Sequence, residues 1–141
     1  MRKLYLIIIS LLLLYGCAGT GTKSYSDVAH SIEEDVNKVF IYRDDSFVCS
    51  AVLMPVRLNG TEIAKLGVGE MVVGDGTVGM NTLEAKLGGL CSIGTNTPTV
   101  TFDLADDQNR YFILMMKVKF LTSKIQIMET LKSAWQAQVK E

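Results

Sequence analysis

The amino-acid sequence predicts a mainly β protein: an antiparallel β-sandwich of about seven strands that ends in a carboxyl-terminal helix. Apolar and polar residues alternate through most of the chain after residue 38. Gly, Asn, Asp and Pro separate the alternating runs at intervals of about ten residues. Near the carboxyl end the apolar period changes from two to four. With 48% hydrophobic and 21% charged residues, the composition is that of a folded chain.

Seven segments have the alternation or the β-branched and aromatic content of strands. In residues 82–87, for example, Leu83, Ala85 and Leu87 alternate with polar neighbours. This pattern is typical of antiparallel strands with one buried face. The predicted strands are residues 39–43, 51–58, 61–66, 70–73, 82–87, 99–104 and 112–120.

Three sequence features indicate how the strands are connected. Asn59 and Gly60 form the strongest short hairpin signal, because both tolerate the positive φ of a type I′ turn. Pro55 cannot donate to a ladder, so its strand is expected at an edge or with a bulge. Residues 74–79 satisfy the G-x-G-x-x-G pattern of dinucleotide sites, but a strand-like period follows where such a site needs a helix. We therefore expect a glycine-rich hairpin there.

The helix at the carboxyl end is predicted over about residues 130–139, because Ile127, Leu131, Trp135 and Val139 recur every four positions. Trp135 is expected to pack this helix on the sandwich. A second, short helix is indicated before the first strand by the spacing of Val28, Ile32 and Val36. Residues 31–34 there have the form of a capping box.

The amino terminus has the form of a secretory signal. Arg2 and Lys3 precede an apolar run over residues 4–15, which as a helix would span roughly 18 Å, short of the ~30 Å hydrocarbon core. It therefore predicts a signal peptide over residues 1–16 and not a stable membrane span.

At the end of this run, Leu14-Tyr15-Gly16-Cys17 resembles the bacterial lipobox. The resemblance implies transfer of a diacylglyceryl group to the Cys17 thiol and cleavage between Gly16 and Cys17. Since Ala18 is not the aspartate that retains lipoproteins at the inner membrane of enteric bacteria, the periplasmic face of the outer membrane is favoured. The alternative is an ordinary signal peptide with a cysteine near its cleavage site.

Loss of residues 1–16 would change the formal net charge from −1 to −3, so lipid and not charge is the expected anchor. Residues 18–26 are small and polar, as in a flexible tether. The predicted organisation is a signal peptide (1–16), a lipidated Cys17 with its tether and short helix (17–35), and the sandwich with its carboxyl-terminal helix (36–141).

Three blocks carry a family resemblance over about residues 38–126. They are Val39-Phe-Ile-Tyr-Arg43 with Asp44-Asp-Ser46, Pro55-Val-Arg-Leu-Asn-Gly60 with Ile63-Ala-Lys-Leu66, and Arg110-Tyr-Phe-Ile-Leu114. Together they resemble the domain-of-unknown-function 2846 family of small bacterial envelope lipoproteins. The resemblance implies a sandwich like transthyretin-like or PEGA-like modules. It implies no established activity and supplies no catalytic residues.

With Cys17 lipidated, Cys49 and Cys91 are the remaining thiols in an oxidising compartment, which favours a disulfide between them. The bridge would close a loop of about 43 residues, for which the chain-entropy model gives roughly 4 kcal/mol. The alternative is two separate thiols.

No catalytic, metal-binding or cofactor-binding residue is predicted. His30 is the sole histidine and lies near the tether, where solvent exposure is expected. Asp103, Asp106, Asp107 and Asn109 could offer oxygens to calcium, but their spacing is not that of an EF-hand, and a solvated turn is favoured. Asp44 and Glu70 are acids that hydrolysis could use, although nothing in the sequence singles them out as a pair. Tyr42 and Tyr111 are the aromatic residues expected at the surface.

The resulting expectation is a non-enzymatic lipoprotein that binds another envelope protein or stabilises an envelope assembly. Pairing through the Pro55 strand is one route to a partner. The alternatives are a cell-wall glycan or peptide hydrolase and a small-ligand or metal-binding protein. Because 14 Lys+Arg are balanced by 15 Asp+Glu, the charge argues against a nucleic-acid partner.

Overall fold

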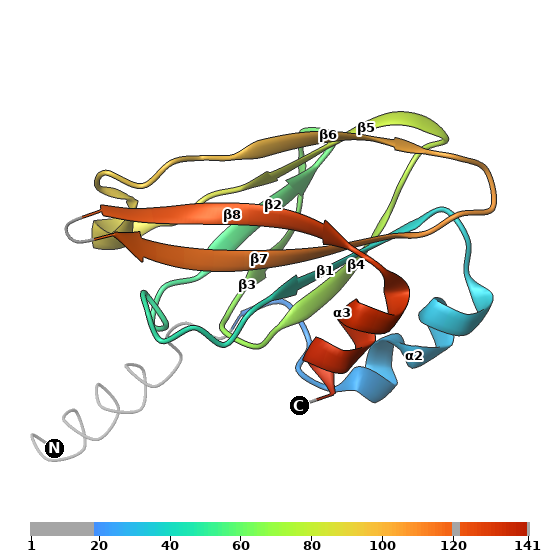
Figure 1. The fold of residues 1–141 in the computed structure, drawn as a ribbon, viewed down its shortest axis with the longest axis horizontal. Coiled ribbons are helices and arrows are strands. Elements are labelled where there is room, and N and C mark those ends of the chain that lie inside the picture. The colour runs from blue at the N-terminus through green and yellow to red at the C-terminus, as the bar shows by residue number, and fades with distance from the viewer. Residues whose placement is uncertain (1–18, 120–121, 141) are drawn as a thin grey trace, which may run out of the picture.

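The computed structural model describes residues 19–119 and 122–140, and in them it is a mainly β protein with two packed sheets and two α-helices (Figure 1). The sandwich with its carboxyl-terminal helix is thus confirmed. The signal peptide, the lipobox, Gly16 and Cys17 lie outside the described residues.

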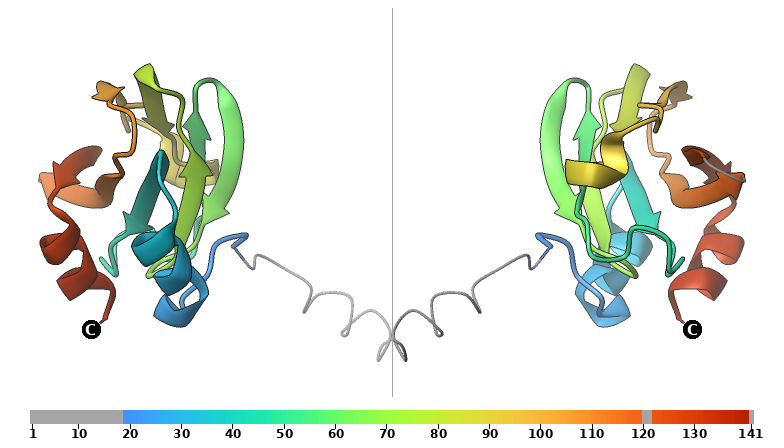
Figure 2. Two further views of the ribbon diagram at one scale, coloured as in Figure 1. Left: turned by 90° about the vertical axis from the view of Figure 1, so that its right-hand side faces the viewer. Right: turned by 90° about the vertical axis from the view of Figure 1, so that its left-hand side faces the viewer.

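The elements follow one another along the chain in a largely β order. They are α2 (Tyr25–Glu34), β1 (Lys38–Arg43), β2 (Met54–Leu58), β3 (Thr61–Leu66), β4 (Met71–Asp75), β5 (Gly79–Ala85), a 3₁₀ turn η2 (Gly89–Ser92), β6 (Thr99–Leu104), β7 (Arg110–Lys119), β8 (Thr122–Thr130) and α3 (Lys132–Val139). One sheet has the order β4-β1-β7-β8, and the other has the order β3-β2-β5-β6. Figure 2 shows the two sheets from both ends.

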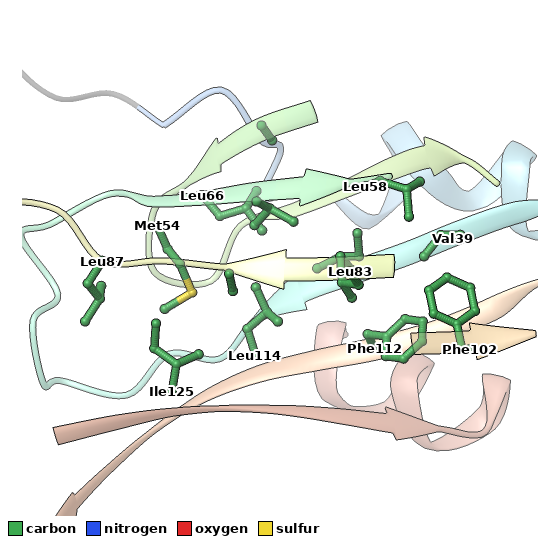
Figure 3. Close-up of a cluster of buried hydrophobic side chains, with 14 of the residues drawn as sticks. Val39, Met54, Leu58, Leu66, Leu83, Leu87, Phe102, Phe112, Leu114 and Ile125 are labelled. Atoms are coloured by element: carbon green, nitrogen blue, oxygen red, sulfur yellow. The ribbon is translucent and has the colours of Figure 1, made fainter. Parts of the chain in front are cut away.

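The apolar residues between the sheets form the main core (Figure 3). Alternate side chains of each sheet enter it, among them Val39, Leu83, Phe112 and Leu114, all fully buried. Phe102 of β6 meets Phe112 of β7 across this core, with ring centroids 4.9 Å apart. The period-two pattern of the sequence is this inward-facing set.

A second core lies between the outer face of β1 and β7 and the two helices. The Phe40 ring stacks on Tyr111, and Trp135 meets Phe40 edge-on while its Nε1 donates to the Phe112 carbonyl at 3.1 Å. The predicted role of Trp135 is confirmed. Tyr42 and Tyr111 are buried, so their predicted surface position is wrong, because the helices cover this outer face.

The strands are not all antiparallel as predicted, since β1 pairs with β7 in parallel. From Val39 to Arg43 every residue of β1 is buried, as in a strand with both faces covered. Alternation of apolar and polar residues indicates which face of a strand is buried, but it does not indicate the direction of the neighbouring strand. The sequence pattern therefore could not predict that β7 runs parallel to β1.

The chain after β7 differs from the prediction. Residues 122–130 form a strand, β8, that pairs antiparallel with β7 over its whole length, and α3 begins only at Lys132. Ile127, which the four-residue spacing placed on the helix, packs on the main core from β8 instead. Leu131 is the N-cap of α3 and its side chain is exposed. The spacing from Ile127 to Leu131 was a coincidence of two adjoining elements.

The first helix is also longer than predicted. It spans Tyr25–Glu34, so Ser31 lies in its last turns and does not cap its start. Val28 and Ile32 are buried in the second core, whereas Val36 is exposed. Helix α2 therefore packs on the sandwich through these two residues.

Of the two predicted hairpin turns, one is confirmed and the other is wrong. The Asn59-Gly60 turn is confirmed, with φ of 52° and 81° between the paired strands β2 and β3. Residues 74–79 are not a hairpin, because β4 and β5 belong to different sheets. A Cβ on Gly76 would clash with Leu104 and lie 3.2 Å from Val39 Cγ2, so only glycine lets this crossover pass so close to the core.

The Pro55 strand is interior and not an edge, because β2 lies between β3 and β5. The predicted irregularity is present, since the β2–β3 register shifts between Val56 and Arg57. The sequence pattern detected the bulge and could not place the strand within its sheet.

The Cys49–Cys91 disulfide is confirmed, with the two Cα atoms 6.2 Å apart. It joins the loop after β1 to η2, and Figure 1 shows both at the end of the sandwich opposite to the helices.

Replacing both cysteines, by Cys49→Ser and Cys91→Ser together, is expected to lower the free energy of unfolding by about 2–4 kcal/mol, because the unfolded chain regains the freedom of a long loop. Urea denaturation of the oxidised protein and of the double variant measures the difference. Reduced wild-type protein is the control and should match the variant. Equal stability of oxidised wild type and variant would contradict the prediction.

Candidate functional site

The buried guanidinium of Arg43 organises the end of the sandwich that carries the disulfide. Arg43 is the last residue of β1 and is fully buried. Its Nη1 donates to the carbonyls of Val52 at 2.5 Å and Leu66 at 2.8 Å, and its Nη2 donates to the Cys49 carbonyl at 3.0 Å. Burial lowers the pKa of Arg43, an effect opposed by the charges of Asp44 and Glu70. The guanidinium therefore holds the disulfide loop against the end of β3.

Glu70 and Asp44, the two acids considered for hydrolysis, flank this cation but have separate surroundings. The Glu70 carboxylate accepts from the backbone amides of Gly67 at 2.8 Å and Gly21 at 3.3 Å. Burial raises the pKa of Asp44, which directly follows Arg43. The two acids are thus charge partners of a structural cation.

The segment after Ala18 is paired with both sheets. The Thr20 amide donates to the Lys65 carbonyl at 2.9 Å, and the Lys65 amide donates to Thr20 Oγ1 at 2.8 Å. Thr22 and Met71 exchange two backbone hydrogen bonds, at 2.9 and 2.8 Å. Thr20 and Thr22 therefore join the edge strand β3 of one sheet to the edge strand β4 of the other.

The expectation of a flexible tether over residues 18–26 is therefore wrong from Thr20 onward, and Tyr25 already belongs to α2. A Cβ on Gly21 would lie 2.6 Å from Leu66 Cδ2 and 2.8 Å from the Met71 carbonyl. The glycines between the threonines permit this close approach. Small polar composition suggested flexibility, and the alternation of Gly with Thr was the signal that could have indicated pairing.

The outer edge of β8 exposes backbone hydrogen-bonding groups. The Asn96 carboxamide pairs with Ile125 as a strand would: its Nδ2 donates to the Ile125 carbonyl at 3.1 Å and its Oδ1 accepts from the Ile125 amide at 2.8 Å. The Ile125 backbone therefore faces away from β7. Because antiparallel pairing alternates with a period of two, the backbone groups of Ile127 and Glu129 face the same way. We call residues 127–129 the β8 edge.

A surface pocket of about 410 Å³ lies beside the β8 edge. Arg110 and Glu129 form an ion pair in it at 3.1 Å, and Arg110 also donates to the Asp103 carbonyl. Burial raises the pKa of Tyr111, which lines the same pocket. The remaining lining residues are Asn109, Thr130, Leu131 and Lys132. The carboxylate in this lining is thus ion-paired with a guanidinium.

The other predicted candidates do not converge on a site. His30 is exposed as predicted and lies 3.3 Å from Glu34. Asn109 is structural: its side chain accepts from the Lys38 amide at 2.8 Å and donates to the Asp35 carbonyl at 2.9 Å. Across residues 19–119 and 122–140, no three His, Cys, Asp or Glu side chains are grouped so that they could hold a metal ion.

Comparison with protein-family models, with curated proteins and with solved structures finds no match to this chain. In the part of the chain that the structure describes, no helix is both long and apolar enough to span a bilayer.

Arg43→Leu is expected to lower the free energy of unfolding by about 2–4 kcal/mol, because it removes the three guanidinium hydrogen bonds, one of which goes to the buried Leu66 carbonyl. Arg57→Leu is the matched control. Arg57 makes only a half-exposed ion pair with Glu84, and its loss should cost about 0.5 kcal/mol or less. Urea denaturation compares the two variants, and similar losses in both would refute a special role for Arg43.

Proposed function

We propose that this chain is a lipid-anchored envelope protein whose sandwich domain binds a protein partner by strand addition at the β8 edge. The anchor is the lipidated Cys17, and the periplasmic face of the outer membrane is the favoured location. The support for the anchor is the order of a basic start, an apolar run and the lipobox-like Leu14-Tyr15-Gly16-Cys17.

The observation that carries the binding role is the pairing of Asn96 with the Ile125 backbone, from which the outward orientation of the Ile127 and Glu129 backbone follows. Unpaired amides and carbonyls on an edge strand are a template for another strand. An extended peptide laid against them would gain main-chain hydrogen bonds, with its side chains contacting alternate positions. Met128 and Leu131 are exposed apolar residues on and next to this edge. The partner that fits is an extended segment with apolar side chains.

A binding role is favoured over hydrolysis by the placement of the acids. Glu129 is paired with Arg110 beside the β8 edge, and Glu70 is bound by the amides of Gly21 and Gly67. A glycosidase needs two carboxyl groups facing one scissile bond. The contacts of these acids are instead those of structural residues.

Cys17→Ser is expected to abolish labelling of the protein by palmitate and to leave the precursor uncleaved, because the serine hydroxyl cannot carry the thioether. Metabolic labelling followed by mass measurement of the chain tests this. Continued labelling of the variant would refute the anchor.

Strand addition is tested by a photo-crosslinking amino acid placed at Met128 in cells. Glu129→Pro removes an outward amide donor without removing a ladder bond to β7, so the crosslinked product should disappear. Glu129→Ala, which also loses the Arg110 ion pair but keeps the amide, should retain it. Absence of any product from Met128, or equal products from both variants, would contradict the proposal.

A further inference from the structure

We infer that the end of the sandwich bearing the disulfide docks directly on the lipid surface, so that the protein is held at the membrane in one orientation. This inference rests on the proposed lipid anchor at Cys17. We call this surface the disulfide end. It is formed by residues 43–53, 66–70 and 87–96 with the adjoining ends of β7 and β8.

The distance between the anchor and the folded domain is short. Only Ala18 and Gly19 separate Cys17 from Thr20, whose amide and hydroxyl are bonded to Lys65. Fully extended, three residue steps cover about 11 Å. The headgroup region of one leaflet is itself about 5–8 Å thick. A domain fixed at Thr20 therefore cannot leave the headgroup surface without breaking its bonds to β3 and β4.

Direct contacts connect the anchored segment to the disulfide end. Gly21 bonds to the Glu70 carboxylate, which also binds the Gly67 amide next to Leu66. The Leu66 carbonyl accepts from Arg43, and Arg43 also binds Cys49 of the disulfide. Cys49 is bonded to Cys91, whose carbonyl accepts from the Thr95 hydroxyl. The Thr95 hydroxyl also lies 2.9 Å from the hydroxyl of Ser123 in β8.

The disulfide end carries apolar side chains on separate segments. Phe47 in the loop after β1 is 90% exposed, Ile93 after η2 is 77% exposed and Val118 near the end of β7 is 54% exposed. Insertion of an exposed phenylalanine ring into a membrane interface removes its apolar surface from water, which stabilises the bound state. These side chains lie on loops and a strand end, where they can enter the headgroup region without disturbing either core.

Two lysines where β7 and β8 adjoin the disulfide end suit lipid phosphates. Lys117 and Lys124 are directly paired across β7 and β8, and both are exposed. Among the described residues neither forms an ion pair, and like charges placed opposite each other repel. An anionic headgroup between them would relieve this repulsion. Asp45 is exposed beside Phe47, so the cationic part of the disulfide end is the β7–β8 part.

The test uses the full lipidated chain in vesicles of phosphatidylethanolamine and phosphatidylglycerol that contain dibrominated phosphatidylcholine, which quenches tryptophan on contact. Phe47→Trp should lose most of its added emission and shift to the blue. Met80→Trp is the matched control, because Met80 is 68% exposed at the opposite end of β5 and should keep its emission. Trp135 is buried in both variants and contributes a constant background.

The acyl mass of each sample is measured first, so that failure of the anchor is seen separately. A chain without acyl groups refutes the anchor and the docking together. An acylated chain in which the Phe47→Trp emission is unquenched, or in which Met80→Trp is quenched as much, overturns the docking and leaves the anchor intact. The docking on lipid would also be overturned if the disulfide end were buried against a protein in native membranes and the Phe47→Trp emission were not quenched in vesicles.

The charge component is tested in the Phe47→Trp background. Lys117→Gln with Lys124→Gln should weaken quenching in vesicles that contain phosphatidylglycerol and have no effect in vesicles of phosphatidylcholine alone. Lys132→Gln with Lys140→Gln changes the net charge by the same amount at the first residue and the C-cap of α3, away from the disulfide end, and should leave quenching unchanged. Equal effects of the two pairs would overturn the role of Lys117 and Lys124.

Discussion

The disulfide end of this protein depends on one buried cation. The Arg43 side chain is fully buried, and a charge in such a place is tolerated only when it is hydrogen-bonded. The bonds it makes go to backbone carbonyls of two segments, the disulfide loop and the end of β3. Among the described residues the disulfide loop has no strand partner, whereas Leu66 is the last residue of β3 and pairs with Met54 of β2. The Arg43 side chain thereby holds the disulfide-bonded loop against the end of β3.

The same cation connects the fold to the amino-terminal segment. Glu70 lies close enough to influence Arg43 electrostatically, and its carboxylate binds the amide of Gly21. Thr20 and Thr22 then join the open edges of both sheets. The seam between β3 and β4 is thus closed by the segment that follows the proposed lipid anchor. The described chain is bonded to both sheets from Thr20 onward, three positions after the proposed lipid anchor.

The two sheets have different surroundings, and this difference guided the choice of the surfaces that we propose for binding. The sheet containing β1 and β7 is covered on its outer face by α2 and α3, whose aromatic core includes Phe40, Tyr111 and Trp135. With that face occupied, its β8 edge and the disulfide end are the surfaces to which we assign functions. The proposed interactions of the two surfaces differ. The β8 edge would bind through main-chain hydrogen bonds, and the disulfide end through apolar insertion and cationic contacts.

The sequence by itself determined the features that depend on neighbouring residues. Alternation marked most strands and their buried faces, Asn59-Gly60 specified its turn, and the count of cysteines selected Cys49 and Cys91 as a pair. The sequence is also the basis for the proposed lipid anchor at Cys17, which lies outside the described residues.

Only the tertiary structure decided which elements become neighbours. The parallel pairing of β1 with β7, the separation of β4 from β5, the burial of Tyr42 and Tyr111, and the role of Arg43 all depend on residues distant in sequence. A period of two states that one face of a strand is buried, and it is the same whether the neighbour runs parallel or antiparallel. Likewise, Gly and Thr after Cys17 have the composition of a tether, and they become part of the fold because Lys65 and Met71 present backbone groups to them. Local patterns record the environment of a residue, whereas the identity of its partners is set when the whole chain packs.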